Sequence, residues 1–578
     1  MACEFIPVLK KLQKSSKNSI DNSNEYDDFK KYFHVHRNIE DELKTILSEI
    51  QKNNTKSLVL ICGNAGDGKS NLLAELKNGE DRYLLNGFEI INDATESEIP
   101  TQSNLENLKN RLSAFSDQNL STGNEKIIIA INLGVLNNFI ESSFGESFQA
   151  LKDYVIQENI LVGNDRSEGY KEDSVFQHVS FSNFQIFSLT PEGIDTSYLM
   201  GLLHRIFDEN LENPFYAAYK THCFNCPIRN RCPIKQNYEL FFSDEKKKYI
   251  SLKVAEVVLK QNSIVTTREF LNLIYDILVP NNFNMEDYGR LKNKDLFKRY
   301  YNDTTPILLN EKPRVSKLLD SIQSLSVLRN RSESFDDLSF KYNALQDIKP
   351  ELLEAVKGTP YSEFSEELDL SSLLNLDSDL KNLIFRFIIL LGEMHNMDFL
   401  KEGKFDAFID CLYHYCIDDT KTMIGLEKDV KKSIKLWEDY NANNNLYVIG
   451  DSPEYLLLEK IDFKRKATRL NYRNKEVIQR FSPYIAIQFE QIGNSNQRID
   501  LIINHSLFFL MSLLKEGYQP TIDDLNRFTN FESFISELKK LGNQRSSINI
   551  VPKEDVSKIF TFSKISENEE YYEFGLGD

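Results

Sequence analysis

The stretch that decides the fold is Gly63-Asn64-Ala65-Gly66-Asp67-Gly68-Lys69-Ser70. The run before it, Ser57-Leu58-Val59-Leu60-Ile61-Cys62, is short and apolar, as in a buried parallel strand. Residues 71–78 follow with helical spacing and end before Gly79. A strand, a glycine loop and a helix in this order predict an α/β sheet whose first strand leads into a phosphate-binding loop.

The loop matches the pattern G-x-x-x-x-G-K-[ST]. Its glycines let backbone N–H groups turn inward towards phosphate oxygens, and the following helix presents its positive end. Lys69 is expected to reach the terminal phosphates of ATP, and Ser70 to hold Mg²⁺ through its hydroxyl. The alternative is a glycine turn that precedes a helix by chance. The predicted nucleotide-binding residues are Gly63, Asn64, Ala65, Gly66, Asp67, Gly68, Lys69 and Ser70, with Lys69 also a catalytic candidate.

Periodicity along the rest of the chain predicts the fold class. Further strands at 88–91 and 126–131, with a helix over about 105–115 between them, indicate an α/β P-loop NTPase domain, AAA+-like or related. A helix-rich region follows, and the C-terminal region is mixed α+β, with a hairpin near Gly493. The helices expected in the middle region cover 252–259, 268–278, 315–328 and 380–391.

Five segments are predicted. They are a polar N-terminal arm at 1–31, the α/β domain at 32–215, a cysteine knuckle at 216–240, a helix-rich or lid domain at 241–450 and a mixed α+β domain at 451–578.

Bulk composition excludes several classes of protein. The chain has 578 residues, 41% hydrophobic and 27% charged, which is typical of a multidomain globular protein. A net charge of -18 argues against a protein that coats nucleic acid with its whole surface. No apolar run is long enough to span a membrane, and the N-terminus lacks the apolar core of a secretory signal. Seven cysteines, an odd and mostly scattered set, then favour a reducing cytoplasm.

Hydrolysis needs a group that holds Mg²⁺ or directs the attacking water, and two strand ends offer candidates. Asp93 follows the strand at 88–91, with Glu96 close behind, and is the expected Mg²⁺ ligand. Asn132 follows the better-spaced strand at 126–131 and is a candidate sensor of the terminal phosphate. Asp93 could instead be a helix cap or turn former.

Arg268 stands at the start of a predicted helix in Thr266-Thr267-Arg268-Glu269. It is a candidate arginine finger, from a lid or from a second copy of the chain. The alternative is a surface arginine in an ion pair.

Three of the cysteines are grouped in Cys223-Phe224-Asn225-Cys226-Pro227-Ile228-Arg229-Asn230-Arg231-Cys232. A C-x₂-C pair with a third cysteine soon after predicts a zinc site on a short polar loop. His222 is adjacent to Cys223 and poorly placed as the fourth ligand; His204 is another possible donor. An iron–sulfur cluster and three packed, reduced cysteines are the alternatives.

A basic stretch, 464–475, contains six lysines and arginines with one tyrosine. It is a candidate surface for nucleic-acid phosphate, or else a solvated helix face.

Three segments together resemble the DptF family of DNA phosphorothioation-dependent restriction proteins, which belong to a bacterial defence system. They are Gly63–Ser70, the run Ile91-Asn92-Asp93-Ala94-Thr95-Glu96-Ser97, and the run Ala130-Ile131-Asn132-Leu133-Gly134-Val135-Leu136-Asn137-Asn138-Phe139. Asn213-Pro214-Phe215-Tyr216-Ala217-Ala218-Tyr219 also fits that family. The resemblance is clear over roughly the first 240 residues.

The resemblance implies ATP binding at the glycine loop, and action on DNA, directly or within a complex, together with DptG-like and DptH-like subunits. Two classes of function remain open: an ATP-hydrolysing subunit of a restriction complex, or a nucleotide-dependent switch or scaffold that hydrolyses little or no ATP. A water-directing acid distinguishes them, so Asp93 and Glu96 are the discriminating residues. The sequence shows no clustered carboxylates typical of a nuclease site.

Overall fold

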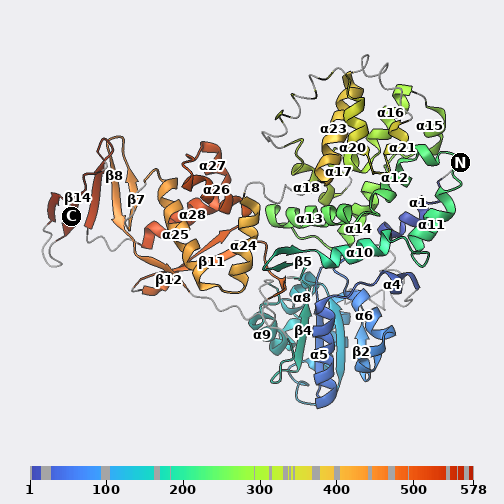
Figure 1. Cartoon of the computed structure of the whole chain (residues 1–578). Helices are drawn as coiled ribbons and strands as arrows, with labels where there is room; N and C mark the ends of the chain where they lie inside the picture. The colour runs from blue at the N-terminus through green and yellow to red at the C-terminus, as the bar shows by residue number, and fades with distance from the viewer. Residues whose placement is uncertain are drawn as a thin grey trace.

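The structure is a computed structural model. It describes residues 3–14, 28–64, 66–92, 104–161, 169–181, 184–291, 293–311, 316–329, 336–337, 340, 342, 345, 347–366, 378–395, 404–440, 445–466, 476–492, 494–541, 547–555, 557–564 and 572–576. Figure 1 shows three lobes: an α/β lobe built around β1, a helical lobe, and a C-terminal lobe that ends in an extended sheet.

The α/β lobe contains a parallel sheet in the order β2-β3-β1-β4. β1 and β3 are buried along their whole length, because every residue in them except their first is apolar. The three strands predicted here are confirmed with their bounds. The strands are β1 (Ser57–Cys62), β2 (Phe88–Ile91), β3 (Lys126–Ile131) and β4 (Phe176–Ser180).

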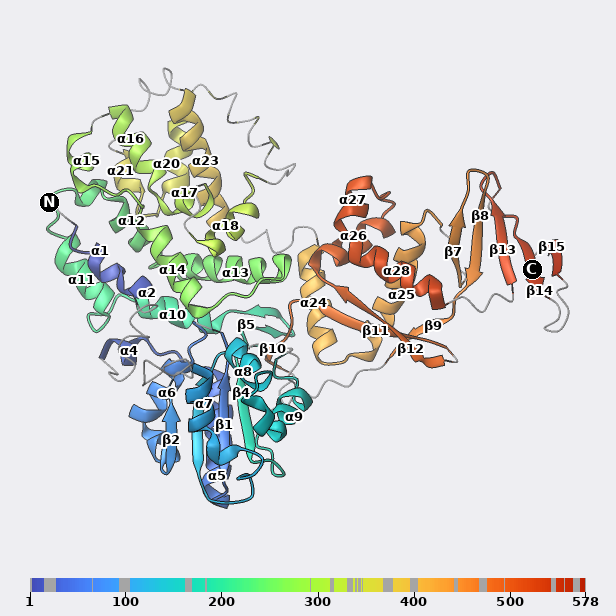
Figure 2. The same ribbon diagram turned by 180° about the vertical axis from the view of Figure 1, so that it is seen from behind.

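Helices cover both faces of this sheet, as the parallel arrangement requires. Val59 and Ile61 of β1 pack with α5 and α6, whereas Leu58, Leu60 and Cys62 pack with α7, α8 and α9. Figure 1 shows the face with α5 and α6, and Figure 2 the face with α7 and α9. The helices are α5 (Asn38–Asn53), α6 (Lys69–Asn78), α7 (Asn104–Arg111), α8 (Leu133–Ile140) and α9 (Gln149–Gln157), with 3₁₀ turns η1 (Glu80–Leu85), η2 (Ser113–Phe115) and η3 (Gly145–Ser147).

The chain leaves the neighbouring parallel strands β1 and β3 towards opposite edges of the sheet, because β1 connects to β2 and β3 connects to β4. α6 leaves β1 on one face, and α8 leaves the neighbouring strand β3 on the other. In open α/β sheets such a reversal leaves a crevice at the carboxyl ends of the two strands, where ligands bind. The glycine loop lies at this end of β1.

A second sheet joins the α/β lobe to distant parts of the chain, in the order β10-β5-β6. β5 continues from the end of β4, whereas β10 comes from near the C-terminus and pairs antiparallel with β5. The strands are β5 (Phe184–Thr190), β6 (Gly193–Asp195) and β10 (Ile478–Arg480).

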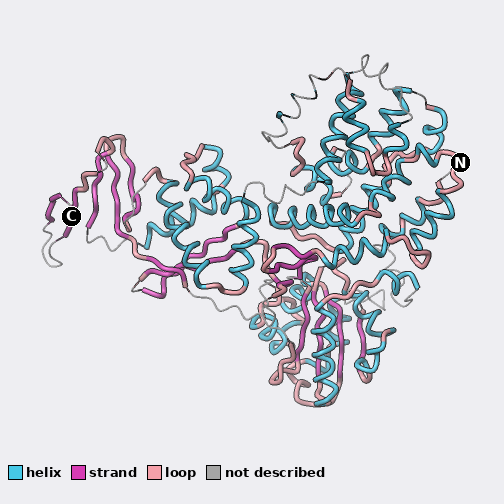
Figure 3. Tube along the Cα trace, in the orientation of Figure 1, coloured by secondary structure: helices cyan, strands magenta, loops and turns pink. Residues whose placement is uncertain are grey.

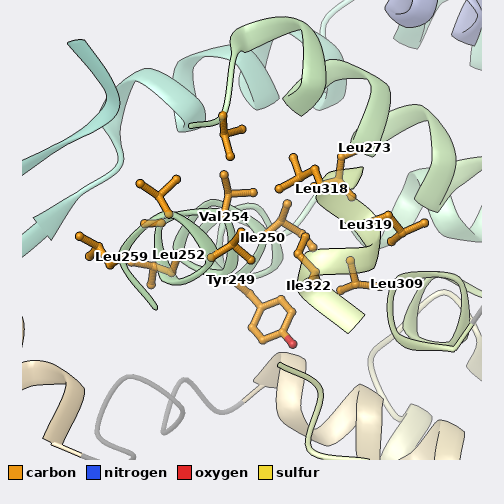
Figure 4. Close-up of a cluster of buried hydrophobic side chains, with 14 of the residues drawn as sticks. Tyr249, Ile250, Leu252, Val254, Leu259, Leu273, Leu309, Leu318, Leu319 and Ile322 are labelled. Carbon is orange, nitrogen blue, oxygen red and sulfur yellow. The ribbon is translucent and has the colours of Figure 1, made fainter. Parts of the chain in front are cut away.

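The middle of the chain forms the helical lobe, which is almost entirely helix in Figure 3. The four helices predicted there are confirmed as α13, α14, α18 and α23. Figure 4 shows apolar side chains of α13, α14, α17 and α18 in one interior. The helices are α10 (Ser197–Phe207), α11 (Pro214–Cys223), α12 (Pro233–Leu240), α13 (Asp244–Gln261), α14 (Thr267–Leu278), α15 (Met285–Arg290), α16 (Asn293–Asn302), α17 (Thr305–Asn310), α18 (Lys317–Ser324), α20 (Lys349–Val356), α21 (Ser362–Glu366) and α23 (Ser378–His395), with the 3₁₀ turn η4 (Arg229–Arg231).

The start of the chain belongs to this lobe as well. The sequence predicts a polar arm at 1–31, but residues 3–14 form α1 (Ile6–Leu9) and α2 (Lys11–Lys14), which pack against α11 and α14. Phe5, Leu9 and Leu12 are fully buried in the main core because their spacing puts them on one face. α4 (Asp28–Phe33) then leads to the α/β lobe.

The C-terminal lobe begins before the predicted boundary at 450, because α24 and α25 pack on α26. The hairpin expected near Gly493 is confirmed as β11 and β12, in a sheet ordered β12-β11-β9, and a separate sheet has the order β15-β14-β13-β8-β7. The elements are α24 (Phe405–Cys416), α25 (Thr420–Trp437), β7 (Leu446–Asp451), β8 (Tyr455–Lys460), β9 (Phe463–Arg465), β11 (Ile485–Gln491), β12 (Asn494–Ile503), α26 (His505–Lys515), α27 (Ile522–Arg527), α28 (Thr529–Leu541), β13 (Ser547–Pro552), β14 (Phe560–Lys564) and β15 (Tyr572–Leu576). Among the described helices, none combines the length and the apolar character needed to cross a bilayer.

Candidate functional site

The glycine loop, residues 63–70, connects the carboxyl end of β1 to α6. Both strands beside β1 hold it in place: the Gly63 amide donates to the Ile131 carbonyl at 3.3 Å, and the Phe181 amide donates to the Cys62 carbonyl at 2.8 Å. The loop is therefore anchored at the edge of the sheet where the crevice lies.

The loop needs glycine for two reasons. Gly66 and Gly68 have φ of 94° and 103°, in the left-handed region that side chains disfavour. At Gly63 a β-carbon would lie 2.9 Å from both Asp67 Oδ2 and Phe181 Cβ, which is too close for any side chain. Ala65 lies outside the described residues.

The N-cap of α6 is a glycine. Gly68 supplies no side-chain acceptor to the amides of the first turn. Ser70 is half-buried on this turn, and its hydroxyl bonds to none of the residues that the structure describes. Backbone amides at a helix N-terminus favour phosphate.

Lys69 is folded over the loop. Its Nζ donates to the carbonyls of Gly63 at 2.8 Å and Asn64 at 2.6 Å. The ammonium group is thus held in the mouth of the loop, where it can exchange these carbonyls for phosphate oxygens.

The Asp67 side chain forms a hydrogen bond with the backbone of the loop. Its Oδ2 accepts the Asn64 amide at 2.5 Å. Burial raises the pKa of this carboxyl, although the Asn64 amide, Lys69 and Arg37 act in the opposite direction. A phosphate that uses the Asn64 amide must displace this carboxylate.

Arg37, which sequence reasoning missed, holds the loop from outside. Its Nη1 donates to the Asp67 carbonyl at 3.0 Å. The guanidinium carbon lies 5.1, 5.8 and 4.9 Å from the ring centroids of Phe181, Phe184 and Tyr198, within the range of cation–π attraction. Arg37 precedes an amphipathic helix in the sequence, and nothing in that local pattern points to the loop.

Arg268 comes to the loop from the helical lobe. A β-carbon on Gly66 would lie 3.2 Å from Arg268 Cβ and 3.4 Å from its Cδ. The position is fixed by the start of α14, where Thr266 accepts the Glu269 amide at 3.2 Å and Glu269 accepts the Thr266 amide at 2.9 Å. The candidate arginine and the candidate loop are therefore neighbours within one chain.

A small pocket adjoins the loop. Its wall combines apolar and aromatic side chains with polar and charged ones, and the polar and charged residues are six of the eleven that line it. The lining residues are Arg37, Asn64, Asp67, Phe181, Phe184, Gln185, Ile186, Ile264, Val265, Thr266 and Thr267.

β10, which comes from the C-terminal part of the chain, also reaches this pocket. Arg480 of β10 forms an ion pair with Glu42 of α5, with Nη2 and Oε2 2.5 Å apart, and both side chains are largely buried. The Arg480 guanidinium lies 4.9 Å from the centroid of Phe184, which lines the pocket.

β3 and β2, the two strands expected to be followed by a polar site residue, lie at different places in the sheet relative to β1. Cys62 pairs with Ile131 in β3, so Asn132 is next to the loop. Its Oδ1 accepts the Gly134 amide at 2.8 Å and caps α8. β2 is one strand further from β1. Asp93 and Glu96, which follow β2, lie outside the described residues.

Two of the three grouped cysteines lie at helix ends, and only Cys226 lies in the loop between them. Cys223 is the last residue of α11, Cys232 is the N-cap of α12, and both are buried; Cys226 is half-buried between them. Among the described side chains, no group of three or more His, Cys, Asp or Glu forms a ready metal site. The two histidine candidates pair with acids: His204 Nδ1 lies 2.7 Å from Asp208 and His222 Nδ1 3.0 Å from Glu4.

The described part of the basic stretch is a strand and not a helix. Lys464 and Arg465 belong to β9, 3.5 Å from Glu490 and 3.8 Å from Asp418 respectively. Residues 467–475 lie outside the described residues.

Comparison of the chain with family models, with curated proteins and with solved structures gives no match.

Proposed function

We propose that the chain is a P-loop NTPase that binds ATP and Mg²⁺ at residues 63–70 and hydrolyses the nucleotide. One observation carries the proposal: at the carboxyl edge of β1, the Lys69 ammonium group lies over the carbonyls of the loop, and the N-cap of α6 is a glycine with no capping side chain. This is the arrangement that a triphosphate requires.

Each residue has a role in this proposal. The backbone amides of the loop bind the phosphates, Lys69 bridges the terminal ones, and Ser70 holds Mg²⁺. Asp93 supplies the second Mg²⁺ contact, with Glu96 beside it, and Asn132 orients the terminal phosphate or the attacking water. Arg268 stabilises the charge that develops on the transferred phosphoryl group.

We place the nucleoside at the pocket beside the loop, which as it stands has room for only about one water molecule and must open to admit it. Phe181, Phe184 and Ile186 offer apolar and aromatic contacts for a base, while Thr266 and Thr267 offer hydroxyls. Because this pocket lies between the loop and α14, bound nucleotide would link the α/β lobe to the helical lobe.

We further propose that the ATPase serves a bacterial DNA phosphorothioation-dependent restriction complex, with DptG-like and DptH-like partners. The resemblance of residues 63–70, 91–97 and 130–139 to DptF proteins supports this role. DNA is then reached by the complex, or directly by a local basic surface in a chain of net charge -18.

A nucleotide-dependent switch is the second candidate, and one observation favours it. The strands beside β1 are followed by Asn132 and Phe181, and the Asn132 carboxamide oxygen already caps α8. No described residue at these two strand ends supplies a carboxylate, so slow hydrolysis is compatible with the described part of the site.

The decisive measurement is ATP binding by Lys69→Ala, with Lys77→Ala as the matched control at the other end of α6. Losing a charge-assisted contact to phosphate should weaken binding at least about 30-fold, or about 2 kcal/mol. Lys77, which donates to Asn92 at 3.1 Å, should be replaceable without loss of affinity. Calorimetry and circular dichroism on the same samples separate lost binding from lost fold. Equal affinity in Lys69→Ala and the parent would refute the phosphate site.

Purification of the tagged chain from its source cell tests the complex. DptG-like and DptH-like chains should co-purify in an ATP-dependent manner. Their absence with and without ATP would remove the restriction complex from the proposal while leaving the nucleotide site intact.

A further inference from the structure

A short strand from the C-terminal part of the chain supports one wall of the pocket beside the glycine loop. Figure 2 shows β10 beside β5, and in their antiparallel pairing Arg480 stands opposite Phe184. Gln185, the next residue of β5, donates from Nε2 to the Phe481 carbonyl at 2.9 Å, across 296 positions of sequence. Phe184 and Gln185 both line the pocket. β10 therefore holds two neighbouring lining residues, one by a ring contact and one by a hydrogen bond.

Two arginines contact the Phe184 ring. The guanidinium carbon of Arg480 lies 4.9 Å from the ring centroid, and that of Arg37 lies 5.8 Å from it. Both distances are within the range of cation–π attraction. Arg37 also donates from Nη1 to the Asp67 carbonyl of the glycine loop at 3.0 Å. The ring thus connects β10 to the residue that holds the loop.

An ion pair fixes the Arg480 guanidinium. Its Nη2 lies 2.5 Å from Oε2 of Glu42, and the two side chains are only 7% and 12% exposed. Glu42 belongs to α5, the helix whose N-cap is Arg37. Arg480 is therefore attached to the start of α5 and lies against Phe184 at the same time.

This ion pair is a costly way to stabilise a fold. Two buried charges lose their hydration, and apolar side chains of similar volume often serve stability equally well. Arg480 Nη1 is also buried, and it bonds to none of the residues that the structure describes, which adds to the cost. What a planar guanidinium held by a carboxylate supplies is a fixed orientation. The arrangement therefore favours a role in positioning.

We propose that Arg480 is a positioning residue for the nucleotide: its guanidinium, held by Glu42, keeps the Phe184 ring in place as the wall against which the base packs. This role rests on the proposed function, because it requires a nucleotide in this pocket. The site is then composite. Residues 63–70 bind the phosphates, and β10, from the C-terminal part of the chain, supports the wall for the base.

The supported wall also determines how the pocket opens. β10 leads into β11 of the C-terminal lobe, and the buried Phe481 ring lies 5.5 Å from Phe187 of β5. Residues 264–267, which also line the pocket, lead into α14 of the helical lobe. Because the pocket is nearly closed and its β5 side is tied to β10, we expect the nucleoside to enter as residues 264–267 move away.

The test measures the affinity of the full chain for ATP and for pyrophosphate by calorimetry. Arg480→Met removes the charge but keeps a long side chain, so ATP binding should weaken about tenfold. Pyrophosphate has no base and should bind as in the parent. Glu42→Gln should shift both affinities in the same way but less. The control is Arg465→Met in β9, an arginine that is 12% exposed and lies 3.8 Å from Asp418; it should bind both ligands like the parent.

A double-mutant cycle shows whether Arg480 acts through the ring. Phe184→Leu removes the ring, so adding Arg480→Met to it should lower ATP affinity by less than about a further twofold. Circular dichroism checks that each chain is folded. Three results in folded chains would overturn the role of Arg480 and leave the phosphate site standing: parental ATP affinity in Arg480→Met, equal losses for ATP and pyrophosphate, or additive losses in the double variant. A parent chain that binds neither ligand would overturn the nucleotide site as well.

A measurement on the parent chain does not depend on any variant folding. ATP that carries a photoreactive azide on its base should, after irradiation, label residues 184–186, and excess ATP should prevent the labelling. Labelling confined to peptides outside the pocket lining would show that the base packs elsewhere, and the role of Arg480 would fall with it.

Discussion

Arg268 of α14 packs directly on Gly66 of the glycine loop, with only 3.2 Å between Arg268 Cβ and the position of a β-carbon on Gly66. The two residues belong to different lobes and are two hundred positions apart. Gly66 has a φ of 94° as well, so neither its backbone nor its surroundings accept a side chain. The contact places the start of α14 against the loop. A movement of the helical lobe would therefore change the packing around Gly66.

Arg268→Ala should lower ATP turnover at least about 10²-fold while ATP affinity falls much less, because the guanidinium acts mainly on charge that develops during transfer. Arg268→Lys should recover little, since a lysine lacks the planar fork. The control is Arg290→Ala, a highly exposed arginine in a 3.2 Å pair with Glu286. Steady-state turnover and calorimetry on each variant decide the matter. A folded Arg268→Ala chain with parental turnover would mean that the arginine only packs.

Asp93→Asn should abolish ATP turnover with binding retained, because an amide cannot favour deprotonation of the attacking water. Glu96→Gln should have a smaller effect if Glu96 only assists. Asn132→Ala should reduce turnover partially and also cost about 1 kcal/mol of stability, since it removes the cap of α8. Asn132→Ser retains a capping group and separates the two effects. If the parent chain shows no ATP turnover even with its partners and DNA, a nucleotide-dependent switch explains the site better than an ATP-hydrolysing subunit does.

Ile264→Trp should fill the pocket beside the loop and weaken ATP binding roughly tenfold. Ile264 is 65% exposed, so the larger side chain need not disturb the core. Because the indole would block the nucleoside and not the phosphates, pyrophosphate binding should stay unchanged. Ile156→Trp places the same indole at another exposed isoleucine and should bind ATP like the parent. Equal losses for ATP and pyrophosphate would place the nucleoside elsewhere.

Three of the four parallel strands of the α/β core could be predicted from sequence with their bounds. β1, β2 and β3 keep their predicted bounds because each is a short apolar run, and the glycine pattern marks the turn into α6. The order of the strands could not be predicted, since β2 and β3 are both mostly apolar and both are followed by an asparagine, Asn92 and Asn132. Only the backbone pairing decides that Asn132, and not the residue after β2, is next to the loop.

The parts that sequence reasoning missed depend on contacts between distant segments. Arg37 and Arg480 carry no local pattern, yet the fold brings them to the loop and to the pocket. Phe5, Leu9 and Leu12 lie just before the polar stretch 15–27, and their short apolar repeat is hard to recognise as helix beside it. A hydrophobic period of two turns is too short to recognise without its partner surface.

Asp276 of α14 gives the fold a pH dependence whose sign can be worked out. Burial raises the pKa of its carboxyl to about 6 from an ordinary value of 3.8, while hydrogen bonds from Ser316 and Gln13 act in the opposite direction. Below about pH 4 the group is protonated in both the folded and the unfolded chain and has no effect. Between about pH 4 and 6 the unfolded chain releases the proton first, so folding becomes less favourable as pH rises. Above about pH 6 the carboxyl is ionised in both states, and the folded chain carries the full free-energy cost of the buried charge.

Asp276→Asn removes the ionisation but keeps the shape of the side chain, so it should raise the melting temperature above about pH 6, and the gain should disappear below about pH 4. Gln13→Ala is the informative companion. It removes the 3.4 Å hydrogen bond from Gln13 Nε2 that favours the charged carboxylate and joins α2 to α14. In Gln13→Ala the pKa of Asp276 should therefore be higher than in the parent chain. The pH range over which the stability of the fold decreases should then extend to higher pH. Thermal unfolding of the three chains from pH 4 to 8 measures both effects. A gain for Asp276→Asn that is the same at every pH would show that packing, and not buried charge, sets the stability of α14.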